Sequence, residues 1–418
     1  MLFTPTRDAG LERLNQFLPR AGRAYANNRN HDDGPPQDGG ARSNVSQLSP
    51  WLHAGLLSET EVVSATLSQH SPSAAEKFIA EVFWRVYFKG YLEQRPSVWA
   101  QYCEDRDAAL ARLDNNSGLR TAYAEATEGR TGIEAFDVWA RELVETGYLH
   151  DHARMWFASI WIFTLKLDWE LGADFFLRHL VDGDAASNTL SWRWVGGLHT
   201  KGKTYLARPD NIARYTANHP DGPLAAEGLA GDAPALEEPV EHTRRTLVLP
   251  APLRSVALDA PYALVLHDEA ASHEPLDLPS PPALIIGAAR SAQRSPIEVG
   301  EKAAAFAGDA VQSGVAKAAQ AFDVPTATWS SDAALAPLLE DAGLTQVAVP
   351  YLPTGWTHDA LWPELAPMVD NHRAHVLLDD LNRATWPHAK AGFFGVKKQI
   401  DKILRELAIT GEDLFGPR

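Results

Sequence analysis

An acidic stretch rich in proline, glycine and alanine, residues 219–243, divides the chain into two parts of different character. Its sequence, HPDGPLAAEGLAGDAPALEEPVEHT, favours neither helix nor strand and is typical of an interdomain linker. Before it, apolar residues recur at three- and four-residue spacing, as in 76–92 and 136–147, which indicates helices. After it, short β-branched runs alternate with helical segments, which indicates a parallel sheet. The sequence therefore predicts an all-α domain over residues 1–218 and a Rossmann-like α/β domain over residues 244–418.

Individual elements of the second part can be assigned from the same patterns. We expect strands at 245–249, 262–267, 283–287, 346–352 and 375–380, and helices at 332–343 and 392–407. The last of these helices would place Val396, Ile400, Ile403 and Leu407 on one face. In the first part, the polar Gly/Pro-containing residues 27–44 predict a loop, and Gly147 is placed to cap a helix.

Composition restricts the class of protein. The only cysteine in 418 residues, Cys103, excludes a disulfide framework and a cysteine metal cluster, and it fits a reducing cytoplasm. The most apolar stretch, 155–169, is short for a membrane span and carries Lys166 and Asp168, so we expect a buried helix and no membrane contact. The net charge of −16 is uneven: residues 1–215 hold 23 Lys/Arg and 27 Asp/Glu, and the remainder holds 15 and 27. A basic face in the first part is therefore compatible with the composition.

The run LVDGDAASNTLSWRW at 180–194 carries the most specific pattern in the chain. It places two carboxylates, Asp182 and Asp184, on either side of a glycine in an otherwise apolar segment. Buried carboxylates need partners, and Arg154 is a candidate. The residues alone favour a structural ion pair with a helix cap over a functional site.

Four motifs together resemble the flavin-binding domain of the DNA photolyase/cryptochrome superfamily. The run at 180–194 is similar to the family's DGDxAxNxxxWxW signature. SQLSPWLHAGLLS at 46–58, EVFWRVYF at 81–88 and TGYLHDHARM at 146–155 resemble three further family segments. All four follow the family's order and spacing, over roughly residues 20 to 215. The resemblance implies FAD as cofactor and leaves any antenna chromophore open.

The resemblance implies a role for each matching residue in FAD binding. Ser46, Leu48 and Ser49 match a phosphate cradle, in which hydroxyls and backbone N–H groups hold the pyrophosphate. Arg154 and Asp182 match an ion pair beside the flavin ring, and Asn188 matches the residue facing flavin N5. The full set of implied cofactor-binding residues is Tyr25, Ser46, Leu48, Ser49, Arg85, Asp151, Arg154, Asp182, Asp184 and Asn188.

Catalytic and DNA-contacting residues are implied in the same way. Trp84 and Trp194 match aromatic walls around a flipped pyrimidine dimer, although core packing would also explain them. The other matches are Glu81 as a hydrogen-bonding carboxylate, Met155 as an apolar contact, Arg29 as a phosphate contact, and Trp192 and Trp169 as an electron relay. The relay's third tryptophan is missing ahead of Asn115, and Trp99 or Trp161 could replace it.

The chain also departs from the family pattern. Asp151 stands where the family has Asn, His152 follows it, and Glu134 replaces a usual proline. An added acid near the flavin and DNA opposes phosphate binding or alters flavin protonation. His150 and His152 are two residues apart, a spacing that does not suit a metal site on one helix face, so we expect no metal.

Two functions follow from the resemblance. The first is light-dependent repair of a cyclobutane pyrimidine dimer by electron transfer from excited reduced FAD, by a monomer acting on UV-damaged single-stranded or duplex DNA. The alternative is a cryptochrome-like blue-light receptor that signals to a protein partner. We expect a short form with no antenna domain ahead of the flavin domain. The α/β part, whose end at 386–400 also resembles superfamily sequence, is then either a relocated antenna-like domain or an interaction domain, and it carries no G-x-G-x-x-G or Walker motif.

Overall fold

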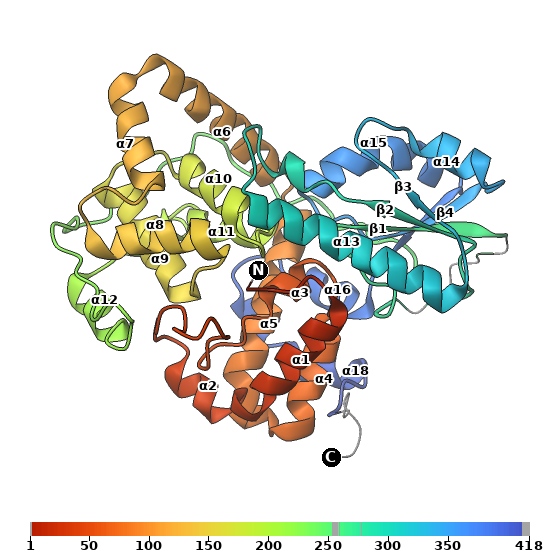
Figure 1. The fold of residues 1–418 in the computed structure, drawn as a ribbon, viewed down its shortest axis with the longest axis horizontal. Helices are drawn as coiled ribbons and strands as arrows, with labels where there is room; N and C mark the ends of the chain where they lie inside the picture. Colours follow the sequence, from red (N-terminus) through yellow and green to blue (C-terminus); the bar gives the residue numbers. More distant parts are fainter. Residues whose placement is uncertain (1, 253–257, 259, 277, 412–418) are drawn as a thin grey trace.

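The computed structural model describes residues 2–252, 258, 260–276 and 278–411 (Figure 1). Helices dominate the chain up to residue 215. They are α1 (Arg7–Phe17), α2 (Arg23–Asn28), α3 (Ser49–His53), α4 (Glu59–Gln69), α5 (Pro72–Glu93), α6 (Ser97–Asn115), α7 (Ser117–Thr127), α8 (Glu134–Thr146), α9 (Asp151–Ser159), α10 (Trp169–His179), α11 (Ala185–Val195) and α12 (Pro209–Tyr215). The predicted helices at 76–92 and 136–147 are α5 and α8, and α8 ends at Gly147 with φ +74°. The all-α character of this part is confirmed.

A five-stranded parallel sheet follows, as predicted for an α/β domain. Its strands lie in the order β3-β2-β1-β4-β5, with bounds β1 (Tyr262–His267), β2 (Leu284–Ala288), β3 (Thr326–Thr328), β4 (Gln346–Pro350) and β5 (Ala374–Leu377). The central strand β1 is buried along its whole length, as expected of a parallel strand covered on both faces. Helices α13 (Glu301–Phe322), α14 (Leu335–Asp341) and α15 (Trp356–Asp370) cover the sheet, with α13 on the opposite face from α14 and α15 (Figure 1).

Three details of the α/β prediction are wrong. Residues 245–249 form no strand; they run past the end of α5, where Arg245 N–H donates to Gln94 O, and Val248 is 82% exposed. The short edge strand β3 was not predicted, because its three residues TAT are partly exposed and give no apolar run. The helix expected at 392–407 is two helices, α17 (Phe394–Lys397) and α18 (Ile400–Glu406), although Val396, Ile400 and Ile403 are buried as predicted.

The most apolar segment of the chain is buried, as predicted. Residues 160–163 of a π-helical turn that continues α9 are all in the core of the helical part. No helix in the described part of the chain is long and apolar enough to cross a membrane.

The end of the chain returns from the sheet to the helical part. Helices α16 (Asp380–Thr385), α17 and α18 pack on or beside α5, and their apolar side chains join the core formed by α1 to α5. Trp386 is buried against Gly90 of α5, and Gln94 Nε2 donates to Trp386 O at 2.9 Å. The residues between 219 and 243 form no helix or strand and lie along the helical part, where Glu238 pairs with Arg193 at 2.6 Å. The division at this segment remains a prediction.

The carboxyl ends of the central strands face the helical part. After β1, Ala271 N–H donates to Ala54 O at 2.8 Å, and Glu269 pairs with Lys89 of α5 at 2.8 Å. After β4, Tyr351 Oη donates to Glu93 at 2.7 Å. These contacts place the sheet's carboxyl edge directly behind α5.

Gly90→Ala should loosen the packing of the C-terminal helices on α5. A Cβ at Gly90 would lie 2.5 Å from Trp386 Cδ1 and 3.0 Å from its Cα, so the side chain or the backbone must shift. Overpacking of this kind typically costs about 1–3 kcal/mol. Urea unfolding and limited proteolysis within residues 386–411 should both detect the change. Gly308→Ala on α13, where no described atom lies within 4 Å of the added Cβ, is the matched control and should be neutral or stabilise by up to ~1 kcal/mol.

Candidate functional site

Two adjoining cavities in the helical part collect nearly all the predicted site residues. The larger has a volume of about 370 Å³ and the smaller about 240 Å³, and both are lined by Arg29, Glu81, Arg85, Asp151, Arg154, Met155 and Asp182. The larger cavity is also lined by Trp84, Asp184, Asn188, Trp192 and Trp194. The smaller is also lined by Tyr25, Ser46, Leu48 and Ser49. Of the predicted residues, Trp169 alone lies outside both cavities.

Asp182 and Arg154 form the predicted ion pair between the two cavities. Arg154 Nη2 donates to both carboxylate oxygens, at 2.9 and 3.1 Å. Burial alone would raise the pKa of Asp182, but Arg154, together with Ser49 and His53, holds the pKa below its ordinary value. The carboxylate therefore stays charged and fixed at the junction of the cavities.

Asp184 lies in a larger buried charge cluster. It caps α11 by accepting from Ser187 N–H at 2.7 Å, and it lies 3.6 Å from Arg85 Nη2 and 3.5 Å from Lys89 Nζ. Burial opposes ionisation, yet Arg85 and Lys89 together hold the pKa of Asp184 well below its ordinary value. Lys89 also pairs with Glu269, so this cluster links the cavity to the loop after β1.

The Ser46–Ser49 cradle is held in an unusual backbone conformation. Gln47 has φ +52°, a left-handed value that costs a non-glycine residue energy and persists where the surroundings fix it. The Gln47 side chain accepts from Arg42 N–H at 2.6 Å, and Arg13 Nε donates to Ser46 O at 2.7 Å. These bonds direct Ser46, Leu48 and Ser49 toward the smaller cavity.

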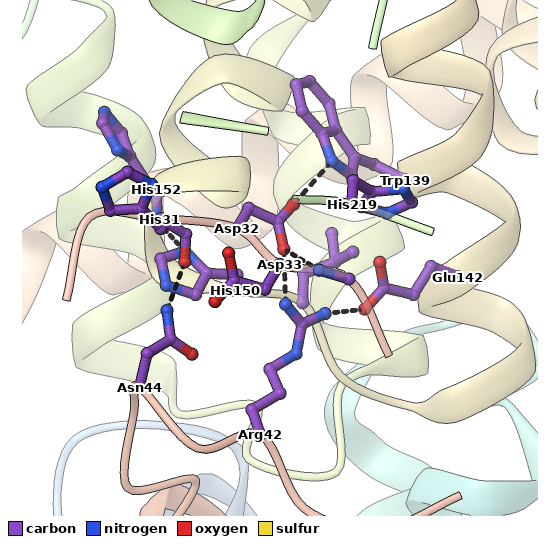
Figure 2. A network of polar contacts seen from close by, with 12 residues as sticks. His31, Asp32, Asp33, Arg42, Asn44, Trp139, Glu142, His150, His152 and His219 are labelled. Atoms are coloured by element: carbon purple, nitrogen blue, oxygen red, sulfur yellow. Dashed lines mark hydrogen bonds and ion pairs between the residues drawn. The ribbon is translucent and has the colours of Figure 1, made fainter. Parts of the chain in front are cut away.

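A buried polar network is centred on Arg42, four residues before the cradle in the sequence (Figure 2). The Arg42 guanidinium bonds to both Asp32 and Glu142, and Trp139 Nε1 donates to the other Asp32 oxygen at 3.0 Å. Burial raises the pKa of Glu142 to about 7 despite Arg42. Burial also lowers the pKa of the neighbouring His150 to about 4. The network ties the loop that carries the cradle to α8.

Two clusters come close enough to hold a metal ion among the described residues. They are Asp32, Glu142 and His219, and His53, Asp184 and Glu269. In each, a basic side chain already pairs with the carboxylates: Arg42 in the first and Lys89 in the second. These pairs supply the positive charge that a bound cation would otherwise bring.

Glu81 and Arg29 form an ion pair on the shared wall of the two cavities. Burial raises the pKa of Glu81; Arg29 opposes this change, and Asp151 adds to it. Asp151 is itself exposed, at the first position of α9. The additional acid thus lies on the cavity wall with Glu81, and its effect on DNA or flavin stays a prediction.

Asn188 and Trp192, both on α11, line the larger cavity. Asn188 Nδ2 donates to Ala173 O at 2.9 Å, which leaves its amide oxygen as an acceptor. Trp192 is buried, and its Nε1 has no hydrogen-bond partner in the described part of the chain. Its ring lies 6.1 Å from Trp161, edge to face, whereas Trp169 lies 5.6 Å from Tyr102. Trp161 is thus in ring contact with Trp192.

Trp84 and Trp194 are half-buried side chains that line the larger cavity. Trp194 stacks on Tyr205 with ring centroids 5.7 Å apart. Trp84 stacks on Phe393, with centroids 4.0 Å apart and an interplanar angle of 15°. Both tryptophans are therefore supported from behind by another aromatic ring.

Comparison with known proteins agrees with this geometry. The family model described as the FAD-binding domain of DNA photolyase matches residues 78–222. Residues 78–222 of the helical part are therefore similar to the FAD-binding domain of this family. Deoxyribodipyrimidine photo-lyase of Streptomyces griseus is 31% identical over 229 residues, covering 50% of this chain and 48% of that protein. A protein of the same name from Thermus thermophilus is 31% identical over 218 residues, covering 52% and 49%.

A bacterial class III photolyase from Agrobacterium tumefaciens, whose crystal structure is known, is 28% identical, with a TM-score of 0.40 and coverage of 51% of this chain and 45% of that one. The chain thus spans about half the length of the curated photolyases it matches. Tyr25 and the Ser46–Ser49 cradle precede the matched range, so their assignment rests on their position in the smaller cavity.

FAD is the cofactor of this family's domain, and the residues present fit it. The wall of the larger cavity includes the apolar side chains of Met155, Phe176, Leu180 and Val195, and a flavin ring requires apolar contacts of this kind. The smaller cavity offers the hydroxyls of Ser46 and Ser49 to a pyrophosphate. Asp182 and Asp184, charged and buried, would be available as acceptors for polar groups of the ring and the ribityl chain.

Several residues that shape the site were not predicted from the sequence. Lys89 could have been found, because it lies four residues after Arg85 and therefore on the same helix face. Arg42 lies in a segment interpreted only as a loop, and Glu269 and Phe393 reach the site through tertiary contacts. No local pattern points to these three residues.

Arg154→Glu should abolish FAD retention. The substitution leaves Asp182 buried beside a second acid, and breaking a buried ion pair typically costs roughly 3–5 kcal/mol. The flavin-to-protein absorbance ratio after purification measures the loss. Arg112→Glu is the matched charge reversal in the exposed pair with Asp168 and should keep FAD. Full retention by Arg154→Glu would contradict the assignment.

Glu142→Gln should remove one pH-dependent part of the stability. Because burial raises the folded-state pKa of Glu142 to about 7, the native protein binds this proton more tightly than the unfolded chain. The tighter proton binding adds to the free energy of unfolding. This contribution is fully present below the ordinary glutamate pKa and is lost as pH rises toward 7. His150, with its lowered pKa, acts in the opposite direction over an overlapping range. The wild-type-minus-variant free energy of unfolding should therefore fall from about pH 4.5 to about pH 7.5; a constant difference would refute the raised pKa.

Proposed function

We propose that the protein is a light-dependent DNA-repair flavoprotein that acts on cyclobutane pyrimidine dimers. The supporting observation is the composition of the larger cavity, where Trp84, Trp194 and Met155 adjoin Glu81 and Asn188. Bound, reduced FAD would supply to the dimer, under blue light, the electron that splits its ring and would regain it afterwards. The matched relatives carry the name deoxyribodipyrimidine photo-lyase, which agrees with the proposal.

The aromatic walls suit a base that has left the DNA stack. Enzymes that act on bases in duplex DNA extrude them into a pocket, and a dimer weakens its own stacking. Half-buried Trp84 and Trp194 present indole surface to the cavity while Phe393 and Tyr205 fix their orientation. Apolar Met155, at the position where (6–4) photolyases carry a histidine, favours the cyclobutane lesion.

The charged residues have complementary roles in this proposal. Glu81, with its pKa raised, is placed to hydrogen-bond a thymine-like carbonyl or N–H in the cavity. Arg29 is about one-quarter exposed. On DNA binding it can leave its ion pair with Glu81 and pair with a DNA phosphate instead. Asn188 offers an uncharged acceptor next to the flavin position.

Trp84→Ala should weaken binding of dimer-containing DNA and slow repair in proportion. One base–aromatic stack is worth about 1–3 kcal/mol, so we expect a loss of roughly tenfold or more in affinity. The measurement is light-dependent restoration of a dimer-containing oligonucleotide by reduced protein at low salt, with affinity from fluorescence anisotropy. Trp362→Ala is the control: it also removes a tryptophan, but on α15 of the sheet domain, and it should leave DNA binding and repair unchanged.

If the reduced wild-type protein neither binds nor repairs the dimer, the repair proposal fails. The photoreceptor function, in which Asp151 alters the flavin's surroundings, would then replace it. A light-dependent change in binding to a protein partner would be the corresponding observation.

A further inference from the structure

The segment after α16 carries an exposed aromatic residue beside the larger cavity. Phe393 is 6% exposed and stacks on Trp84, and the next residue, Phe394, is 73% exposed. Among the exposed large hydrophobic side chains of the described residues, Phe394 is the only aromatic one. A phenyl ring held in water next to an aromatic-walled pocket indicates a contact that the free protein does not make.

This segment is also a basic region of an acidic part of the chain. Residues 386–405 contain five Lys/Arg and one acid, although residues 216–418 as a whole hold 15 basic and 27 acidic residues. Lys390 and Lys398 are exposed, and no carboxylate pairs with either among the described residues. Lys397 pairs with Glu76 at 3.0 Å. Two unpaired ammonium groups therefore flank Phe394.

The same region is joined to a second basic loop through Tyr87. Tyr87 Oη donates to Ala391 O at 2.7 Å and lies 2.9 Å from His199 Nε2. His199 belongs to the loop after α11, which also exposes Lys201 and Lys203. The Trp84 ring lies 5.5 Å from the Tyr87 ring and 4.0 Å from the Phe393 ring, between centroids. Both basic loops therefore adjoin the cavity wall that Trp84 forms.

We propose that residues 390–398 form a DNA-contacting edge of the lesion pocket. Phe394 stacks on a base next to the extruded lesion, and Lys390 and Lys398 contact the phosphates of the same strand. Extrusion of a dimer leaves neighbouring bases unstacked on one side, and such a face is what an exposed phenyl ring can cover. Phe393 is a positioning residue, because it sets the plane of Trp84. The proposal rests on the function proposed above.

The test uses the full-length FAD-loaded protein and two variants, Phe394→Ala and the double variant Lys390→Glu/Lys398→Glu. Affinity is measured by anisotropy for a dimer-containing oligonucleotide and for its undamaged counterpart, over a series of salt concentrations. Phe394→Ala should weaken binding of dimer-containing DNA roughly tenfold and binding of undamaged DNA much less. The double variant should weaken binding of the dimer-containing and the undamaged DNA alike. The slope of log affinity against log salt concentration (the salt slope) should become shallower by about one for each phosphate that its lysines no longer neutralise.

Two controls separate these effects from general damage. Val248→Ala removes an apolar side chain that is 82% exposed, and Arg120→Glu reverses an exposed charge on α7, at the far end of the molecule from α18 (Figure 1). Both should bind DNA like wild type, and all variants should retain FAD, because none of these residues lines the two cavities.

The outcomes distinguish this inference from the proposed function. If wild type prefers dimer-containing DNA and both variants match its affinity and salt slope, the edge is refuted while repair stands. If wild type shows no preference for the dimer, the proposed function fails and the DNA-contacting edge fails with it.

Discussion

The buried charges around Asp184 are the interaction on which the site depends. This carboxylate caps α11, lines the larger cavity and is held ionised by Arg85 and Lys89 of α5. Lys89 also forms an ion pair with Glu269, which lies on the loop after β1. Because an unpaired buried charge is costly, neither the helices nor the sheet edge can move away without leaving one. The flavin cavity is therefore fixed from both parts of the chain.

Helix α5 contacts the cavity with one face and the C-terminal segment with another. Glu81, Trp84, Arg85 and Phe88 recur at three- and four-residue spacing and face the cavity. Tyr87, Gly90 and Gln94 lie on the neighbouring face and contact the segment that follows α16. One helix thus carries the cavity wall on one side and the docking surface of the C-terminal segment on the other.

The sequence predicted what local spacing encodes. Strands β1, β2, β4 and β5 and the helix cap at Gly147 follow from short patterns of apolar or turn-forming residues. The Arg154–Asp182 pair was expected from the family resemblance, and the structure contains it. The contacts that complete the site join residues far apart in sequence: Arg42 with Glu142, Lys89 with Glu269, and Trp84 with Phe393. Arg42, Glu269 and Phe393 lie in segments with no periodic signal for the site, so a single sequence cannot connect them to their partners.

The excess acid of the chain does not by itself oppose DNA binding. Four carboxylates of the acidic part gather elsewhere: Glu269, Glu274, Asp379 and Asp380 line a further cavity of about 630 Å³ at the carboxyl edge of the sheet, with Glu59 and Glu61 of α4. Exposed charges act over roughly 8 Å at physiological ionic strength, so a phosphate at the proposed lesion pocket would experience the local groups and not the net charge. Those groups include Arg29 and the exposed lysines at 201, 203, 390 and 398, with Asp151 as the opposing anion. The field at the cavity is therefore set by where the charges lie, and Asp151 is the carboxylate on its wall that would oppose a phosphate.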